Sequence, residues 1–176
     1  QKINSAGRRD ELHLDQARSM IMEIGRQTER KISDSAKRAI EDLHAAAAAS
    51  IKKITEQAKV GIQTIEALVE EVSHEVIKRI KIAKTKLDET KQDPRTAENA
   101  KENAADAKAL LDAQSNHAMS RLKEETRTAV DENGLLVEQS IKHLRTVADA
   151  AEQRIITARD AAILKLKDIL SRYDSK

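Results

Sequence analysis

One short stretch decides how this chain folds: residues 88–96, which read Asp-Glu-Thr-Lys-Gln-Asp-Pro-Arg-Thr. Pro94 has no N–H to donate inside a helix, and its ring pushes Asp93 out of helical geometry. It is the only proline among 176 residues. The sequence therefore predicts a hairpin turn at residues 89–95, between helices at residues 10–88 and 96–172. We expect residues 1–9 to be a flexible N-terminal segment and residues 173–176 a C-terminal tail of a single rod-like domain.

Outward from this break, both segments repeat every eleven residues. Eleven residues form three turns at ~3.67 residues per turn, close to the ~3.6 of an α-helix, so an apolar stripe of this period runs nearly straight with a slight right-handed drift. The pattern predicts an all-α fold: a long antiparallel two-helix hairpin, each helix ~115 Å long at ~1.5 Å per residue, forming a hendecad coiled coil. The predicted hairpin core is Ile21, Ile32, Leu43, Ile54, Ile65, Val76, Leu87, Ala100, Leu111, Leu122, Asn133, Leu144, Ile155 and Leu166.

Small residues accompany this stripe in further rows of the same period. One row of the first segment begins Gly25, Ala36, Ala47 and Ala58, and a row of the second segment is Ala107, Ala118, Ala129, Ser140, Ala151 and Ala162. Small side chains let two helix backbones approach closely, so we expect both rows to line the contact between the helices.

A short turn predicts a specific antiparallel register, in which Leu87 faces Ala100 and Ile21 faces Leu166. The same register places His44 near His143. It also predicts ion pairs between the helices, each worth about 0.2–1 kcal/mol at the surface, at Arg38–Asp149, Asp42–Arg145, Glu66–Arg121 and Lys81–Asp106.

Asn133-Gly134 is the one candidate break inside the second segment. An Asn-Gly pair favours a turn, which would give a second hairpin and a three-helix bundle. The eleven-residue count, however, runs from Leu122 through Asn133 to Leu144 without a gap. We therefore expect a continuous helix, with a polar layer at Asn133 that fixes register or oligomeric state, and with local fraying or a bend at Gly134.

A second apolar row lies three residues before the large positions. Two helices leave such a band partly uncovered, and an exposed apolar band of this length indicates an association surface. The simplest partner is another copy, which would give an antiparallel four-helix bundle from two hairpins. The predicted association surface is Ile40, Ile51, Ile62, Met119, Val130, Ile141 and Ile163.

Composition narrows the classes of function. Charged residues make up 35% of the chain, and its 32 basic and 30 acidic residues are interspersed, which is typical of solvated helices and unlike the basic clusters that bind nucleic acid. Tyr173 is the only aromatic residue, and there is no cysteine to form a disulfide or a thiolate metal site. No apolar run approaches the length that spans a bilayer. The first residue is Gln, which is typical of a processed chain or a piece of a longer protein.

Catalytic signatures do not emerge from the residues. The chain has no glycine-rich phosphate loop, no Gly-x-Ser-x-Gly and no His-Glu-x-x-His. A paired His44 and His143 would give two metal ligands, fewer than a stable zinc site uses. We therefore expect no enzyme activity, no cofactor, no bound metal and no nucleic-acid partner.

The eleven-residue period resembles that of exchangeable apolipoproteins, and the hairpin plan resembles the cytoplasmic rods of bacterial chemoreceptors. The first resemblance implies a lipid-surface protein, and the second a rod that transmits a helix shift between its ends. The continuous stripe and the second apolar row favour a third function: a structural and interaction module that homodimerises, docks a protein partner and serves as a rigid rod, spacer or scaffold. This is the leading prediction, and the other two are its alternatives.

Overall fold

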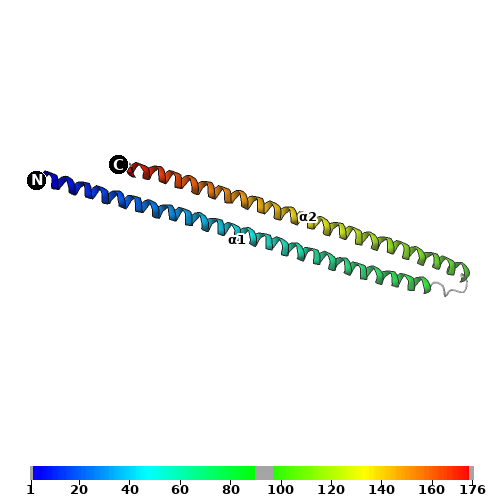
Figure 1. The fold of residues 1–176 in the computed structure, drawn as a ribbon. Coiled ribbons are helices and arrows are strands. Elements are labelled where there is room, and N and C mark those ends of the chain that lie inside the picture. The colour runs from blue at the N-terminus through cyan, green and yellow to red at the C-terminus, as the bar shows by residue number, and fades with distance from the viewer. Residues whose placement is uncertain (1, 90–96, 175–176) are drawn as a thin grey trace. The chain divides into compact units, whose positions relative to one another are not determined.

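Two long helices make up the part of the chain that the computed structural model describes (Figure 1). They are α1 (Lys2–Glu89) and α2 (Ala97–Asp174). The structure describes residues 2–89 and 97–174, with the side chains of residues 6–89, 99 and 101–174. Within these ranges there is no strand, and the two helices pack against each other. The predicted all-helical hairpin is confirmed at this level.

The ends of the helices differ in detail from the prediction. α1 begins at Lys2, so residues 2–9 are helical where the sequence predicted a flexible segment. They contain no proline, and extending an existing helix by one residue costs far less than starting a new one. The turn was predicted at residues 89–95; Glu89 belongs to α1, and residues 90–96 lie outside the described residues. α2 passes through Asn133 and Gly134 without interruption, which excludes a second hairpin there.

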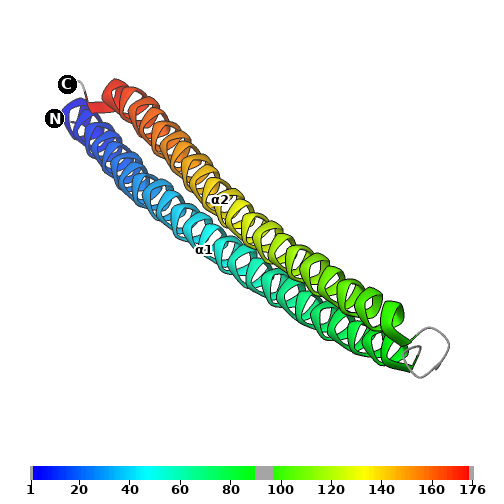
Figure 2. The ribbon, with the colours of Figure 1, turned by 90° about the vertical axis from the view of Figure 1, so that its right-hand side faces the viewer.

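The helices associate in two units. Unit 1 comprises Gln1–Ile51 and Ile141–Lys176, and unit 2 comprises Lys52–Ser140. In each unit a segment of α1 lies beside an antiparallel segment of α2, as Figures 1 and 2 both show.

The register of the helices differs from the predicted one by nine residues in both units. In unit 1, His44 Nε2 lies 2.8 Å from Glu152 Oε2, whereas the prediction placed His143 opposite His44. In unit 2, Lys84 Nζ lies 2.5 Å from Asp112 Oδ1, whereas the predicted register would place residue 103 opposite Lys84. The predicted register is therefore wrong, and with it the four predicted ion pairs.

The reason is that small side chains, not the large ones, occupy the centre of the contact. Among the described residues, the buried apolar side chains are Ala36, Ala104 and Ala148. Gly25 is also buried, and Leu170 lies so close that a Cβ built on Gly25 would be 2.4 Å from its Cδ1. The glycine and alanine row of α1 thus accepts side chains of α2, and the large residues flank this contact.

The small row of α2 is placed differently from the prediction. Ala107 and Ala151 are partly buried, but the other four members, Ala118, Ala129, Ser140 and Ala162, are exposed. The α2 residues at the centre of the contact belong to another row of the same period: Ala104, Ser115, Thr126, Val137 and Ala148. Because this row mixes Ala with Ser, Thr and Val, its composition does not reveal it in the sequence.

Candidate functional site

The residues that the sequence assigned to the hairpin core are partly buried, with two exceptions. Ile65 is 36% exposed, and the side chain of Ala100 lies outside the described residues. The other twelve are Ile21, Ile32, Leu43, Ile54, Val76, Leu87, Leu111, Leu122, Asn133, Leu144, Ile155 and Leu166. Each of them therefore keeps part of its surface open to solvent or to a partner.

The row assigned to association is also partly buried, instead of standing free on an outer face. All seven members, Ile40, Ile51, Ile62, Met119, Val130, Ile141 and Ile163, have this intermediate exposure. Met119 and Val130 line a groove between α1 and α2 in unit 2. The row thus flanks the contact between the helices, and its uncovered part faces this groove at Met119 and Val130.

The unit 2 groove has apolar walls. α1 contributes Val69 and Ile77, and α2 contributes Met119 and Val130. Ile77 is 56% exposed although it belongs to this wall. The two hydroxyl groups in the groove donate to their own helices: Ser73 Oγ to the Val69 carbonyl at 2.7 Å, and Thr126 Oγ1 to the Leu122 carbonyl at 2.6 Å. The floor of the groove therefore offers apolar surface and no free hydroxyl donor.

The rim of this groove is charged, and the two signs are separated by helix. Glu66 and Glu70 stand on the α1 side, and Lys123 and Arg127 on the α2 side. Within the described residues, none of these four side chains takes part in an ion pair. The groove is therefore an apolar trough with one acidic and one basic edge. The sequence had assigned only Glu66 an interhelical partner, Arg121, which instead pairs with Glu125 on its own helix at 3.1 Å.

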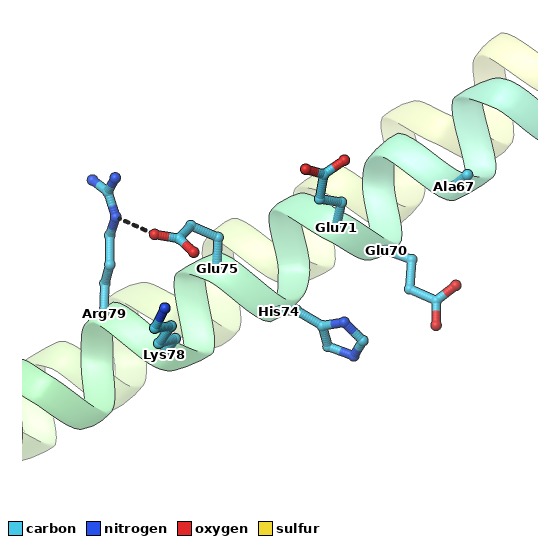
Figure 3. Close-up of a pocket in the computed structure, with 7 residues that line it drawn as sticks. All are labelled: Ala67, Glu70, Glu71, His74, Glu75, Lys78 and Arg79. Atoms are coloured by element: carbon cyan, nitrogen blue, oxygen red, sulfur yellow. Dashed lines mark hydrogen bonds and ion pairs between the residues drawn. The ribbon is translucent and has the colours of Figure 1, made fainter.

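A neighbouring depression on α1 is lined by that helix alone. Figure 3 shows its seven residues, with Glu75 and Arg79 joined by an ion pair of 3.1 Å. Glu70 and His74, which also line the groove, extend toward one side of α1, while Glu71 extends toward the opposite side. Residues of a single helix surface do not converge on a bound molecule, so this depression has no feature of a binding site.

Unit 1 contains a second groove between the helices, and it is almost uniformly apolar. Ile32 and Ala36 of α1 face Ile155, Ala158 and Ala162 of α2. Lys31 and Arg159 also line it, but both are basic and stand on opposite helices. This groove offers apolar area without an opposed pair of charged edges.

The predicted approach of His44 to His143 is not observed. His44 pairs with Glu152, with side-chain exposures of 51% and 28%, and not with His143. Across the described parts of both helices, no three His, Cys, Asp or Glu residues gather closely enough to hold a metal ion. Neither helix, over its described residues, contains a stretch long and apolar enough to cross a membrane.

No family model, curated protein or solved structure matches this chain.

Proposed function

We propose that this chain is a structural and interaction module: a helical hairpin that homodimerises into a four-helix bundle and acts as a rigid rod, spacer or scaffold. The proposal is supported chiefly by how little of its own accessible surface a single chain buries. Its accessible surface is 14379 Å² for a mass of 19.6 kDa. A compact monomer of that mass would expose roughly 8,600 Å² by the usual scaling of surface with mass. The difference exceeds the 2,000–5,000 Å² that a typical obligate dimer interface buries.

The exposure of the apolar side chains also indicates that a single chain buries little of its own surface. Among the described residues, three apolar side chains, all alanines, are buried, whereas seventeen large apolar side chains are at least 36% exposed. Alanines contribute little transfer free energy, and long helices need a buried face for stability. A second copy would cover part of the exposed apolar surface and supply the burial that one hairpin lacks.

The spacing of the interhelical ion pairs supports a hendecad coiled coil as the geometry of the hairpin. Lys84, in unit 2, follows Glu29, in unit 1, by five eleven-residue steps, and each pairs with an α2 residue of opposite charge, Asp112 and Lys167 respectively. Such recurrence is expected if each eleven-residue repeat presents the same face to the neighbouring helix.

Sedimentation equilibrium tests the proposal directly. We expect the chain to have twice its monomer mass of 19.6 kDa at micromolar concentration, and small-angle scattering of the same sample to report an elongated particle. A monomer across the accessible concentration range, or a compact particle, would remove homodimerisation or the rod from the proposal.

The polar residues of the helix contact favour a second candidate, a rod that transmits a helix shift. Ser73, Ser115, Thr126 and Asn133 are all partly buried on or beside the contact. Small and polar contacts are less strongly locked than interdigitated Leu and Ile, which suits two alternative packings of the same helices. Cross-linking along α1 and α2 would change when one end is perturbed if this candidate holds, and would stay constant in a passive scaffold.

A further inference from the structure

We propose that the second copy docks on the unit 2 groove, with the twofold axis of the dimer parallel to the helices, so that α1 of each copy lies over α2 of the other. This inference rests on the proposed homodimerisation. It adds the surface on which the two copies meet and the symmetry axis that relates them. The apolar walls of the groove supply the area to be buried. Its two charged edges supply the orientation.

The groove is open and partly apolar in a single chain. Ile77 is 56% exposed, and Met119 and Val130 are partly buried beside it. Because Ser73 and Thr126 donate their hydroxyls to carbonyls of their own helices, covering the floor would strand neither hydroxyl proton. A second copy of the same face would therefore bury apolar surface without the cost of an unpaired hydroxyl donor.

The charges select one of the two ways in which identical faces can meet. In the register of unit 2, at a rise of ~1.5 Å per residue, Glu70 on α1 lies within ~5 Å along the axis of both Lys123 and Arg127 on α2, and Glu66 lies within ~5 Å of Arg127. A twofold axis parallel to the helices keeps every residue at its own level and places α1 over α2 of the partner copy. Both acidic edges then meet basic edges.

The other twofold axis lies across the helices and gives the opposite result. It places α1 over α1 of the partner copy, running antiparallel, and α2 over α2. Centred on this groove, it brings Glu70 against the partner's Glu70 and the basic edge against the partner's basic edge. Like charges that face each other across an interface cost affinity and select against that arrangement.

One repeat away, the two helices again carry opposite charges at the same level, but α1 is now basic and α2 acidic. Lys59 precedes Glu70 by eleven residues, and Glu138 follows Arg127 by eleven, so each lies on the same face as its counterpart at three turns of helix. In the register of unit 2 they are within ~2 Å of the same level. The parallel axis pairs Lys59 with the partner's Glu138. The charge therefore changes sign at the same level on both helices. Because of this, the two copies remain complementary in charge at both levels of the interface.

Charge reversal tests the proposal on the full chain. Variant A carries Glu66→Lys and Glu70→Lys; variant B carries Lys123→Glu and Arg127→Glu. We expect each alone to weaken homodimerisation at least about tenfold, because its two edges then carry the same sign. An equimolar mixture of A and B should form a heterodimer with affinity close to that of the unmodified chain. Raising the salt concentration should weaken the unmodified dimer and strengthen the A and B homodimers.

A matched control changes the net charge by the same amount as variant A, but at positions outside the groove. Glu71 extends away from the groove side of α1 (Figure 3), and Glu124 lines a depression on α2 that contains none of the groove residues. The variant Glu71→Lys with Glu124→Lys should dimerise like the unmodified chain. If variant A loses helicity by circular dichroism, Glu66→Gln with Glu70→Gln replaces it, and a smaller loss of affinity is expected.

A distance measurement separates the two symmetries without altering the groove. The chain has no cysteine, so Lys52→Cys gives a single site for a spin label. The parallel axis keeps the two labels at one level, within about 30 Å across a bundle with helices 8–10 Å apart. The crossed axis, centred on the groove, separates them by about 50 Å along the helices.

The outcomes distinguish this inference from the proposed function. If the unmodified chain is monomeric, homodimerisation fails and the inference fails with it. If the chain is dimeric but variants A and B dimerise normally, or the labels lie about 50 Å apart, the scaffold proposal survives and the assigned surface or symmetry is wrong. Weakened A and B homodimers, a restored heterodimer and a short label distance together support it.

Discussion

Replacing the helical glycines by alanine one at a time measures how closely the two helices approach. Alanine favours the interior of a helix over glycine by about 0.8–1.0 kcal/mol. A Cβ on Gly61 or Gly134 would meet nothing within 4 Å, so Gly61→Ala and Gly134→Ala should each raise the free energy of unfolding by about that amount. At Gly25 the same Cβ would lie 2.4 and 2.8 Å from the two Cδ atoms of Leu170 and 3.1 Å from its Cγ.

The collision at Gly25 should cancel the gain. Carbon atoms in good contact are about 3.5–4.0 Å apart, so Leu170 must retreat by about 1 Å, and leaving its rotamer costs about 0.5–1.5 kcal/mol. Gly25→Ala should therefore leave the free energy of unfolding unchanged or lower it. The Gly25→Ala variant should be about 1 kcal/mol less stable than the Gly61→Ala variant. In a Leu170→Ala background the obstacle is gone, and Gly25→Ala should recover the full gain of about 0.8–1.0 kcal/mol.

Urea unfolding followed by circular dichroism at 222 nm is the assay. All variants must be compared at one chain concentration, because dimerisation would make the apparent stability concentration-dependent. The contradicting result is that Gly25→Ala stabilises the unmodified chain as much as Gly61→Ala does. That result would mean that Leu170 does not pack on Gly25, and the register of unit 1 would have to be abandoned.

Three further predictions follow from the same geometry. A short thiol cross-linker should join His44→Cys to Glu152→Cys efficiently but not to His143→Cys, which lies nine residues, or ~13 Å, away along α2; equal yields by gel electrophoresis would contradict the register. Ala148→Leu should overfill the centre of the contact and lower the free energy of unfolding in urea by about 1–3 kcal/mol. Asn133→Leu should raise the melting temperature, by burying apolar surface worth about 1 kcal/mol at a partly buried position, and a lower melting temperature would show that the amide makes a needed contact.

Sequence reasoning finds the elements of this fold because they depend on local signals. Pro94 is incompatible with a helix interior, and the residues on either side have high helix propensity, so one break between two helices follows. The continuity of α2 through Asn133 and Gly134 also follows, because the apolar period keeps its phase there. The early start of α1 at Lys2 was not predicted.

The register is harder to predict because a repeating sequence offers several similar solutions. Shifting one helix against the other brings new members of the same rows together, so matching large residues such as Ile32 and Ile155 does not single out one alignment. The deciding feature is which row lies at the centre of the contact. Gly25 and Ala36 provide the close approach, and their α2 partners belong to a row that mixes Ala148 with Thr126. Composition alone does not identify such a mixed row.

The charged edges of the unit 2 groove depend on that register. With the predicted alignment Glu66 would face Arg121 and the pair would be satisfied within one chain. The observed alignment instead leaves Glu66 and Glu70 across an open apolar trough from Lys123 and Arg127. A nine-residue shift thus removes the internal partner predicted for Glu66 and leaves these four charges on two opposed edges, where a partner chain can match them.

Comparing the two grooves shows why charge, and not apolar area, identifies the occupant. The unit 1 groove presents more uniformly apolar walls, such as Ile32 and Ile155, but apolar contact is non-directional and would accept many partners. The unit 2 groove has acid on one helix and base on the other, with both signs reversed one repeat away at Lys59 and Glu138. A second copy turned about an axis parallel to the helices presents the complement of that pattern at each of these levels. Apolar burial would then supply the affinity of the dimer, while the charges would decide its symmetry and its register.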